Sequence, residues 1–210
     1  MARDIKSIMK HIPNTLTLGR LVLAVVFLGM VLYTLKLGEE QTTPTYILVM
    51  FILFVVTALT DIVDGWLARR FDVTSKFGRI VDPLADKFLI VGGFLCLAIV
   101  GQPKFAHFDL SDGFCHFIRW GVLAAIVARE LAVTILRHIA EARGIEFGAT
   151  WSGKVKMFLQ SFGIGTILIK WGFVTRPWGD WITIITLTLL AGVTIYSGID
   201  YFLRERKALK

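Results

Sequence analysis

Six apolar runs, each long enough to cross a lipid bilayer as a helix, dominate this sequence. They lie near residues 14–36, 45–67, 83–101, 116–137, 153–174 and 181–203. A transmembrane helix needs roughly 20 such residues to span a hydrocarbon core of about 30 Å. Hydrophobic residues make up 55% of the chain and charged residues 19%, which is too apolar for an ordinary soluble domain. We therefore expect an all-α, polytopic membrane protein with six transmembrane helices.

The basic residues fix the expected orientation of these helices. Lys and Arg gather in four segments, at residues 3–10, 69–79, 137–156 and 204–210. The remaining connections hold acids, prolines and few bases, so the positive-inside rule assigns the four basic segments to the cytoplasm. Both termini are then cytoplasmic. This topology also explains the net charge of +7, and we expect no nucleic-acid partner.

Residues 1–12 predict a separate amphipathic helix. Ile5, Ile8, Met9 and Ile12 recur at helical spacing among charged residues, before Pro13 interrupts the pattern. Such a helix lies on the inner membrane surface. The alternative is a basic tail that only fixes orientation. We find no internal repeat or long linker, and therefore expect residues 1–210 to form a single membrane domain.

Four aspartates lie within 26 residues, between the second and third apolar runs: Asp61, Asp64, Asp82 and Asp86. Helical spacing puts each pair on one helix face. Two carboxylates about 4 Å apart repel by roughly 4 kcal/mol at an effective dielectric of about 20. Raised pKa values, pairing with nearby Arg and Lys, or divalent cations relieve this repulsion, and hard oxygen ligands suit Mg²⁺ or Mn²⁺ with room for phosphates. The structural alternative makes Asp82 a helix cap, with Asp61 and Asp64 paired to neighbouring arginines.

Small residues beside these acids complete a recognisable pattern. Gly65 and Ala68 leave space for a flat ligand group. The full set comprises Asp61, Asp64, Gly65, Ala68, Arg69, Gly78, Asp82 and Asp86. In order and spacing it resembles the signature of the CDP-alcohol phosphatidyltransferase family, and every signature position is filled.

That resemblance implies a protein of the bacterial inner membrane, surrounded by membrane lipid, with its active site on the cytoplasmic side. Proteins of this kind are commonly homodimers. In the family, the four aspartates surround two divalent ions, Mg²⁺ or Mn²⁺, that clamp the diphosphate of a CDP-linked lipid. The fourth also acts as general base on the incoming alcohol, which here implies Asp86. The residues implied to bind CDP-diacylglycerol are Asn14, Thr17, Arg20, Gly65, Ala68, Arg69 and Ser75.

Segments outside the signature indicate the acceptor alcohol. The segments PNTLTLGR, AREL with Arg137, WSGKVKMFLQ and SGIDYF resemble the bacterial branch of the family that uses glycerol 3-phosphate. Arg129 lies inside an apolar run, where a charge is by default a functional candidate. We expect Arg129, Arg137, Lys154 and Lys156 to bind this acceptor, with Arg137 and Lys154 on its phosphate. The alternatives are cations held at the inner surface by topology, or Arg129 paired with an acid on another helix.

Other functions compete with this one. Within the family, phosphatidylglycerol (giving cardiolipin), inositol phosphate or serine is an alternative acceptor. Membrane prenyltransferases also hold Mg²⁺ and a diphosphate with paired aspartates, but they resemble this chain in chemistry only, and their two motifs lie far apart in sequence. A membrane cation transporter lined by the aspartates is the non-enzymatic alternative, although the acids cluster at one membrane face.

Overall fold

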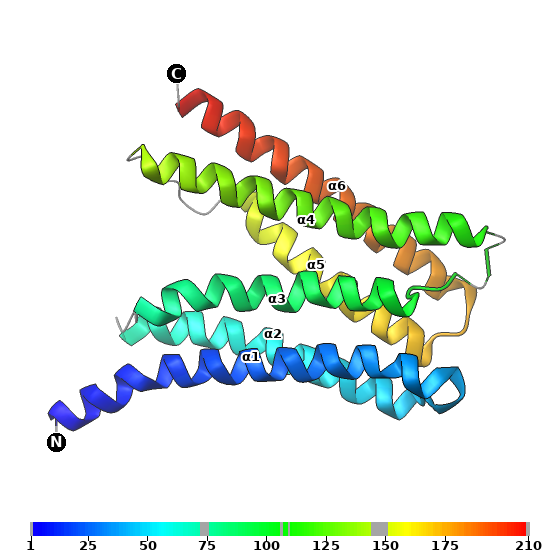
Figure 1. The fold of residues 1–210 in the computed structure, drawn as a ribbon, viewed down its shortest axis with the longest axis horizontal. Coiled ribbons are helices and arrows are strands. Elements are labelled where there is room, and N and C mark those ends of the chain that lie inside the picture. Colours follow the sequence, from blue (N-terminus) through cyan, green and yellow to red (C-terminus); the bar gives the residue numbers. More distant parts are fainter. Residues whose placement is uncertain (1, 72–75, 106, 109, 144–150, 209–210) are drawn as a thin grey trace. The chain divides into compact units, whose positions relative to one another are not determined.

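A computed structural model describes the backbone of residues 2–71, 76–105, 107–108, 110–143 and 151–208. It describes side chains for residues 18–38, 41–60, 85–105, 107–108, 110–139, 143 and 155–203. Within these ranges the chain forms six helices and no strand (Figure 1). The helices are α1 (Ala2–Gln41), α2 (Pro44–Phe71), α3 (Lys76–Val100), α4 (Asp112–Ala142), α5 (Trp151–Phe173) and α6 (Pro177–Ala208). The all-α prediction is confirmed.

Each predicted apolar run falls within one helix, extending at most one residue beyond it. Among the described residues, two stretches are long and apolar enough to cross a membrane, Leu18–Gly38 and Pro177–Leu203. The apolar part of α2, Pro44–Thr60, is shorter. These features suit a membrane protein with two clear candidate spans, and six spans stay a prediction.

The prediction that Pro13 interrupts the helix was wrong, because α1 begins at Ala2 and continues past Pro13. Proline removes one backbone hydrogen bond from a helix and tends to kink or break it, but here the helix continues on both sides. The backbone of α1 departs from helical geometry at Gly38 instead, where φ is 70°. Glycine adopts this left-handed conformation without steric penalty.

The chain divides into two compact units, residues 1–100 and residues 101–210. In the first, unit 1, α1 packs against both α2 and α3. The Phe27 and Phe54 rings lie 5.4 Å apart between α1 and α2, and the Tyr46 hydroxyl donates to the Met30 carbonyl at 2.9 Å. The described core of unit 1 includes buried side chains from all three helices, among them Ala24, Phe27, Val31, Ile47, Met50, Phe54, Leu89 and Leu97.

Helix α3 approaches α1 closely at Gly92. A Cβ atom at this position would lie 2.8 Å from Cδ1 of Leu28, which is shorter than real Cβ contacts. Small residues at helix interfaces allow such approach in membrane proteins. The absence of a side chain at Gly92 therefore allows α3 to lie this close to Leu28 of α1.

In the second unit, unit 2, α6 packs against α4 and α5. The segment before α4 contacts the start of α6, where the Phe108 and Trp181 rings meet edge to face at 5.0 Å. The end of α5 reaches the same place, because Lys170 pairs with Asp180 at 2.5 Å. Helix α4 therefore runs in the same direction as α6, and α5 runs against both (Figure 1).

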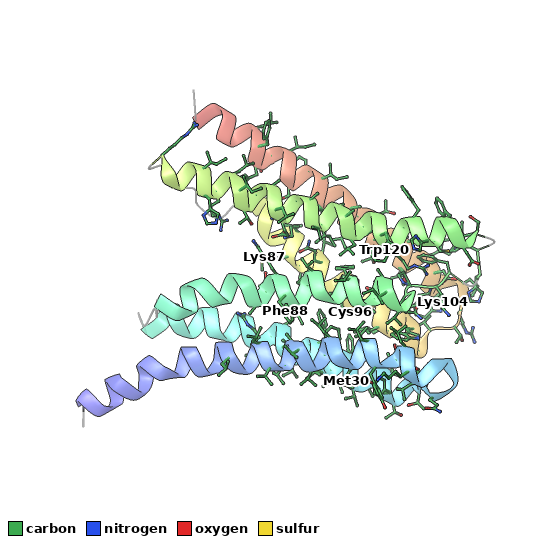
Figure 2. The ribbon with its side chains drawn as sticks, viewed as in Figure 1. Met30, Lys87, Phe88, Cys96, Lys104 and Trp120 are labelled. Carbon is green, nitrogen blue, oxygen red and sulfur yellow. The ribbon has the colours of Figure 1, made fainter. Side chains whose placement is uncertain are left out.

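Asp180 joins three parts of unit 2 at this end. Its side chain is 1% exposed and accepts hydrogen bonds from the backbone N–H of His107 at 3.1 Å and from Lys170. His107 Nδ1 lies 3.0 Å from the same carboxylate. The Lys170 ammonium also donates to the carbonyl of Lys104 (labelled in Figure 2). These bonds hold the segment between α3 and α4 against α5 and α6.

Candidate active site

The four aspartates of the signature lie on two helices of unit 1. Asp61 and Asp64 belong to the second half of α2, and Asp82 and Asp86 belong to the first half of α3. Each pair occupies one face of its helix, since residues three or four apart are neighbours there. Both helices pack against α1. The predicted helical spacing is observed, and the roles of the four carboxylates stay predictions.

Asp86 is the one aspartate of the four whose side chain the structure describes. It is half-buried on α3, between Ala85 at 1% exposed and the buried Leu89. Lys87 and Phe88, which follow it, are labelled in Figure 2. Buried neighbours on both sides hold the helix around Asp86, while the residue itself keeps some exposure. This is the environment that a precisely held but accessible functional group requires.

The donor set of the signature fits a divalent cation of the hard type. Mg²⁺ and Mn²⁺ prefer carboxylate oxygens and keep positions for water and phosphate. Two helices that share α1 as a neighbour supply four carboxylates between them. Among the side chains that the structure describes, no three His, Cys, Asp or Glu could hold a metal ion. Asp61, Asp64 and Asp82 lie outside that described set.

The residues expected to bind the CDP-lipid fall on α1 and α2. Arg20 lies on α1 and is 2% exposed. A buried guanidinium needs acidic or polar neighbours, and α1 is the helix that contacts both aspartate-bearing helices. Asn14 and Thr17 lie on α1, and Gly65, Ala68 and Arg69 lie on α2. The structure describes the backbone of these five residues and not their side chains. Ser75 lies outside the described residues altogether.

Unit 2 contains a cluster of charged side chains drawn from three helices. Arg129 on α4 donates from Nη1 to Oε1 of the adjacent Glu130 at 3.1 Å, and from Nη2 to Oγ of Ser197 on α6 at 2.9 Å. Lys156 on α5 donates from Nζ to the same Glu130 oxygen. We call Arg129, Glu130, Lys156 and Ser197 the Glu130 cluster. It holds two cations and one anion.

The Glu130 cluster is largely shielded from solvent. The side chains of Arg129, Glu130 and Lys156 are 11%, 15% and 5% exposed. Ser197 is 1% exposed. Charges this deep are expensive unless they are paired and hydrogen-bonded. The shared carboxylate supplies that pairing for both cations.

The structure brings together two of the four expected acceptor residues, Arg129 and Lys156. Arg137 is exposed and lies about two turns beyond Arg129 on α4. The backbone of Lys154 lies in the first turn of α5, with its side chain outside the described set. Their roles on the acceptor stay predictions.

Sequence reasoning did not assign a role to Glu130 or Ser197. Glu130 carries a signal that was available, an acid inside an apolar run next to Arg129. Ser197 carries none, because its contact depends on how α6 packs against α4. The alternative that Arg129 pairs with an acid is observed in part, although that acid is its own neighbour on α4 and not a residue of another helix.

Comparisons with known proteins agree with the signature. The sequence model of the CDP-alcohol phosphatidyltransferase family matches residues 10–194. A CDP-diacylglycerol–glycerol-3-phosphate 3-phosphatidyltransferase of Bacillus subtilis is 31% identical, over 96% of this chain and 98% of the relative. A probable phosphatidylglycerophosphate synthase of Mycobacterium tuberculosis is 31% identical, over 92% of this chain and 81% of the relative. A CDP-diacylglycerol–glycerol-3-phosphate 3-phosphatidyltransferase of Rickettsia typhi is 28% identical, over 92% of this chain and 96% of the relative. The match covers most of the helical chain, so this protein belongs to the CDP-alcohol phosphatidyltransferase family.

Proposed function

We propose that this protein transfers the phosphatidyl group of CDP-diacylglycerol to glycerol 3-phosphate, giving phosphatidylglycerol phosphate and CMP in phospholipid biosynthesis. The observation that carries the proposal is the complete aspartate signature on α2 and α3, within a chain matched almost end to end by relatives named for this reaction. The enzyme is thus a CDP-diacylglycerol-dependent phosphatidyltransferase.

The aspartates have two roles in this proposal. Asp61, Asp64, Asp82 and Asp86 would hold two Mg²⁺ or Mn²⁺ ions. Bound there, the ions supply charge neutralisation for the diphosphate and for the departing CMP. The carboxylate of Asp86 also accepts the proton of the acceptor hydroxyl as that oxygen bonds to the phosphatidyl phosphorus. The bond from this phosphorus to the CMP oxygen breaks, and its electron pair leaves with CMP.

Unit 1 also carries the residues proposed to hold the CDP-lipid. Gly65 and Ala68 add little volume on the aspartate-bearing face of α2, so a cytidine or diphosphate group has room to approach the backbone. The polar and basic members of the set bind its oxygens. They are Asn14, Thr17, Arg20, Arg69 and Ser75.

Unit 2 carries the residues proposed to hold the acceptor. Glycerol 3-phosphate is a small dianion, and binding it near a membrane requires fixed cations. Arg129, Arg137, Lys154 and Lys156 are the proposed set. The Glu130 cluster supports this assignment, because it brings two of these cations, Arg129 and Lys156, to one carboxylate.

We also propose six transmembrane spans in a bacterial inner membrane, with both termini and the active site in the cytoplasm. We further propose that residues 1–210 form one domain that works as a homodimer, with residues 1–12 as an amphipathic juxtamembrane segment at the start of α1. Exposed aromatic side chains at the shared end of α4 and α6 support the topology: Phe117, Trp120, Trp178 and Trp181. Aromatic residues favour the membrane–water interface, and this end lies away from the Glu130 cluster along α6.

An acceptor panel tests the proposed activity. Purified protein receives CDP-diacylglycerol, Mg²⁺ or Mn²⁺, and one alcohol at a time: glycerol 3-phosphate, inositol phosphate, serine or phosphatidylglycerol. We expect CMP release with glycerol 3-phosphate. Release with inositol phosphate alone would overturn the acceptor assignment, and no release with any alcohol would overturn the proposal as a whole.

A further inference from the structure

The carboxylate of Glu130 is the common partner of two cations that reach it from different helices. Arg129 Nη1 lies 3.1 Å from its Oε1 atom, and Lys156 Nζ donates to the same atom. A single oxygen therefore sets the separation of the guanidinium and the ammonium. Without it, two like charges would face each other in a region that is largely shielded from water.

Helix α6 restrains the same arginine from the other side. Ser197 Oγ accepts from Arg129 Nη2 at 2.9 Å. A Cβ atom at the neighbouring Gly198 would lie 3.6 Å from Cγ of Arg129, an ordinary packing distance. The aliphatic stem of Arg129 is thus packed against α6 while both of its terminal nitrogens are bonded. Its head group is oriented from two directions.

The Glu130 cluster holds a guanidinium and an ammonium on one carboxylate oxygen. A planar guanidinium and a point-like ammonium bind phosphate oxygens in different ways, so their relative placement decides which phosphate geometry they fit. Glu130 does not itself attract an anion, and its contribution is to hold the two groups that do.

We propose that Glu130 is a positioning residue for the acceptor, which places Arg129 and Lys156 to bind its phosphate, with Ser197 as a second support. This inference rests on the proposed function. Phosphate groups held even 1 Å out of place lose much of the rate that orientation supplies. The effect of losing Glu130 should therefore fall on the acceptor and spare the CDP-lipid.

The test compares three variants of the full-length enzyme. Glu130→Gln removes the charge at nearly constant shape, and Ser197→Ala removes only the supporting hydroxyl. Asp180→Asn is the matched control, because it breaks another buried carboxylate–lysine pair of unit 2. Lys170, the partner of Asp180, lies about 21 Å along α5 from Lys156. Each variant is assayed for kcat and for KM with each substrate, and for thermal unfolding in detergent.

We expect Glu130→Gln to raise the KM for glycerol 3-phosphate about tenfold or more, and Ser197→Ala to raise it about threefold. The KM for CDP-diacylglycerol should change by less than about twofold in both variants. Asp180→Asn should lower thermal stability and leave both KM values unchanged. Combining Glu130→Gln with Lys156→Gln should add little to the loss caused by the lysine substitution alone, since residues that act through each other are not additive.

A purely structural role predicts a different pattern. In that case Glu130→Gln and Ser197→Ala lower thermal stability as Asp180→Asn does, and the acceptor KM stays at its wild-type value. That result overturns the inference and leaves the proposed function standing. If Glu130→Gln does not fold, Ser197→Ala decides by the same criterion. If the wild-type enzyme releases no CMP with glycerol 3-phosphate, both the proposed function and this inference are overturned.

Discussion

Asp86 differs from the other acids of the signature by its place on the chain. It is the last of the four, one turn beyond Asp82 on α3, and it is half-buried between tightly packed neighbours. A carboxylate that is both fixed and accessible suits proton transfer from a substrate hydroxyl. Asp61, by contrast, begins the signature on α2 and is proposed only as a ligand. The two residues should therefore fail in different ways when substituted.

Asp86→Asn should lower kcat by at least about 10²-fold, because a positioned general base typically contributes 10²- to 10⁴-fold. Binding of the nucleotide portion should be largely retained. Both substitutions remove a proposed charged ligand and should weaken metal affinity. Saturating Mn²⁺ should restore turnover more fully in Asp61→Asn, because only Asp86→Asn also removes the proposed base. Titration of Mn²⁺ and of a CDP-lipid against both variants separates these effects. Near-wild-type activity in both variants would contradict the assigned roles.

Arg137→Ala should raise the KM for glycerol 3-phosphate severalfold with little effect on binding of CDP-diacylglycerol. The side chain is exposed, so its loss should leave thermal stability almost unchanged. Arg143→Ala is the matched control, because Arg143 is an exposed cation just beyond α4 that has no proposed role. Equal acceptor KM values in the two variants would show that Arg137 serves orientation in the membrane and not substrate binding.

Helix packing rather than helix formation is what sets the geometry of each unit. In unit 1, α1 is the element that α2 and α3 share, so their aspartates depend on how each helix sits on α1. At Gly92, α3 comes so close to Leu28 of α1 that an added Cβ atom would lie 2.8 Å from its Cδ1 atom. In unit 2, α6 is the helix against which both α4 and α5 pack. Small changes at these contacts should therefore alter both stability and activity.

Gly92→Ala should leave the protein about 1–2 kcal/mol less stable than Gly29→Ala does, because the added methyl group overpacks the contact with Leu28. Gly29→Ala is a control from the same unit, since Gly29 is exposed on α1 with open space around it. That control should be neutral or slightly stabilising, as alanine favours helix more than glycine does. Thermal unfolding of both variants in one detergent measures the difference. A Gly92→Ala protein as stable as the Gly29→Ala protein would contradict the packing argument.

At the scale of the whole molecule, the apolar runs predicted the helices because a chain in lipid has few other ways to satisfy its backbone. Run length alone therefore located all six helices, although several of them extend beyond the predicted runs, α1 by twelve residues at its start and α3 by seven. Pro13 was misjudged, since one missing hydrogen bond did not end α1. The aspartates were identifiable because their spacing is local. The Glu130 cluster and the Asp180 contacts were not, because each joins segments whose alignment depends on helix packing.

The proposed topology predicts that the two ends of α5 face opposite sides of the membrane. Arg143→Cys and Arg176→Cys, each made with Cys96→Ala and Cys115→Ala, place single thiols at exposed positions before and after α5. A membrane-impermeant maleimide should label the thiol at position 176 in intact cells. It should label the thiol at position 143 only in inside-out vesicles. Labelling of both from one side would contradict the proposed spans.

The most direct measurement is the identity of the lipid that the purified protein makes from CDP-diacylglycerol and glycerol 3-phosphate. Mass spectrometry should find phosphatidylglycerol phosphate in amounts equal to the CMP released. Formation should stop with a chelator, resume with Mg²⁺ or Mn²⁺, and be lost in Asp86→Asn. A protein that forms no such lipid, or forms it equally well with the chelator and with Asp86→Asn, would contradict an aspartate-centred phosphatidyl transfer to glycerol 3-phosphate.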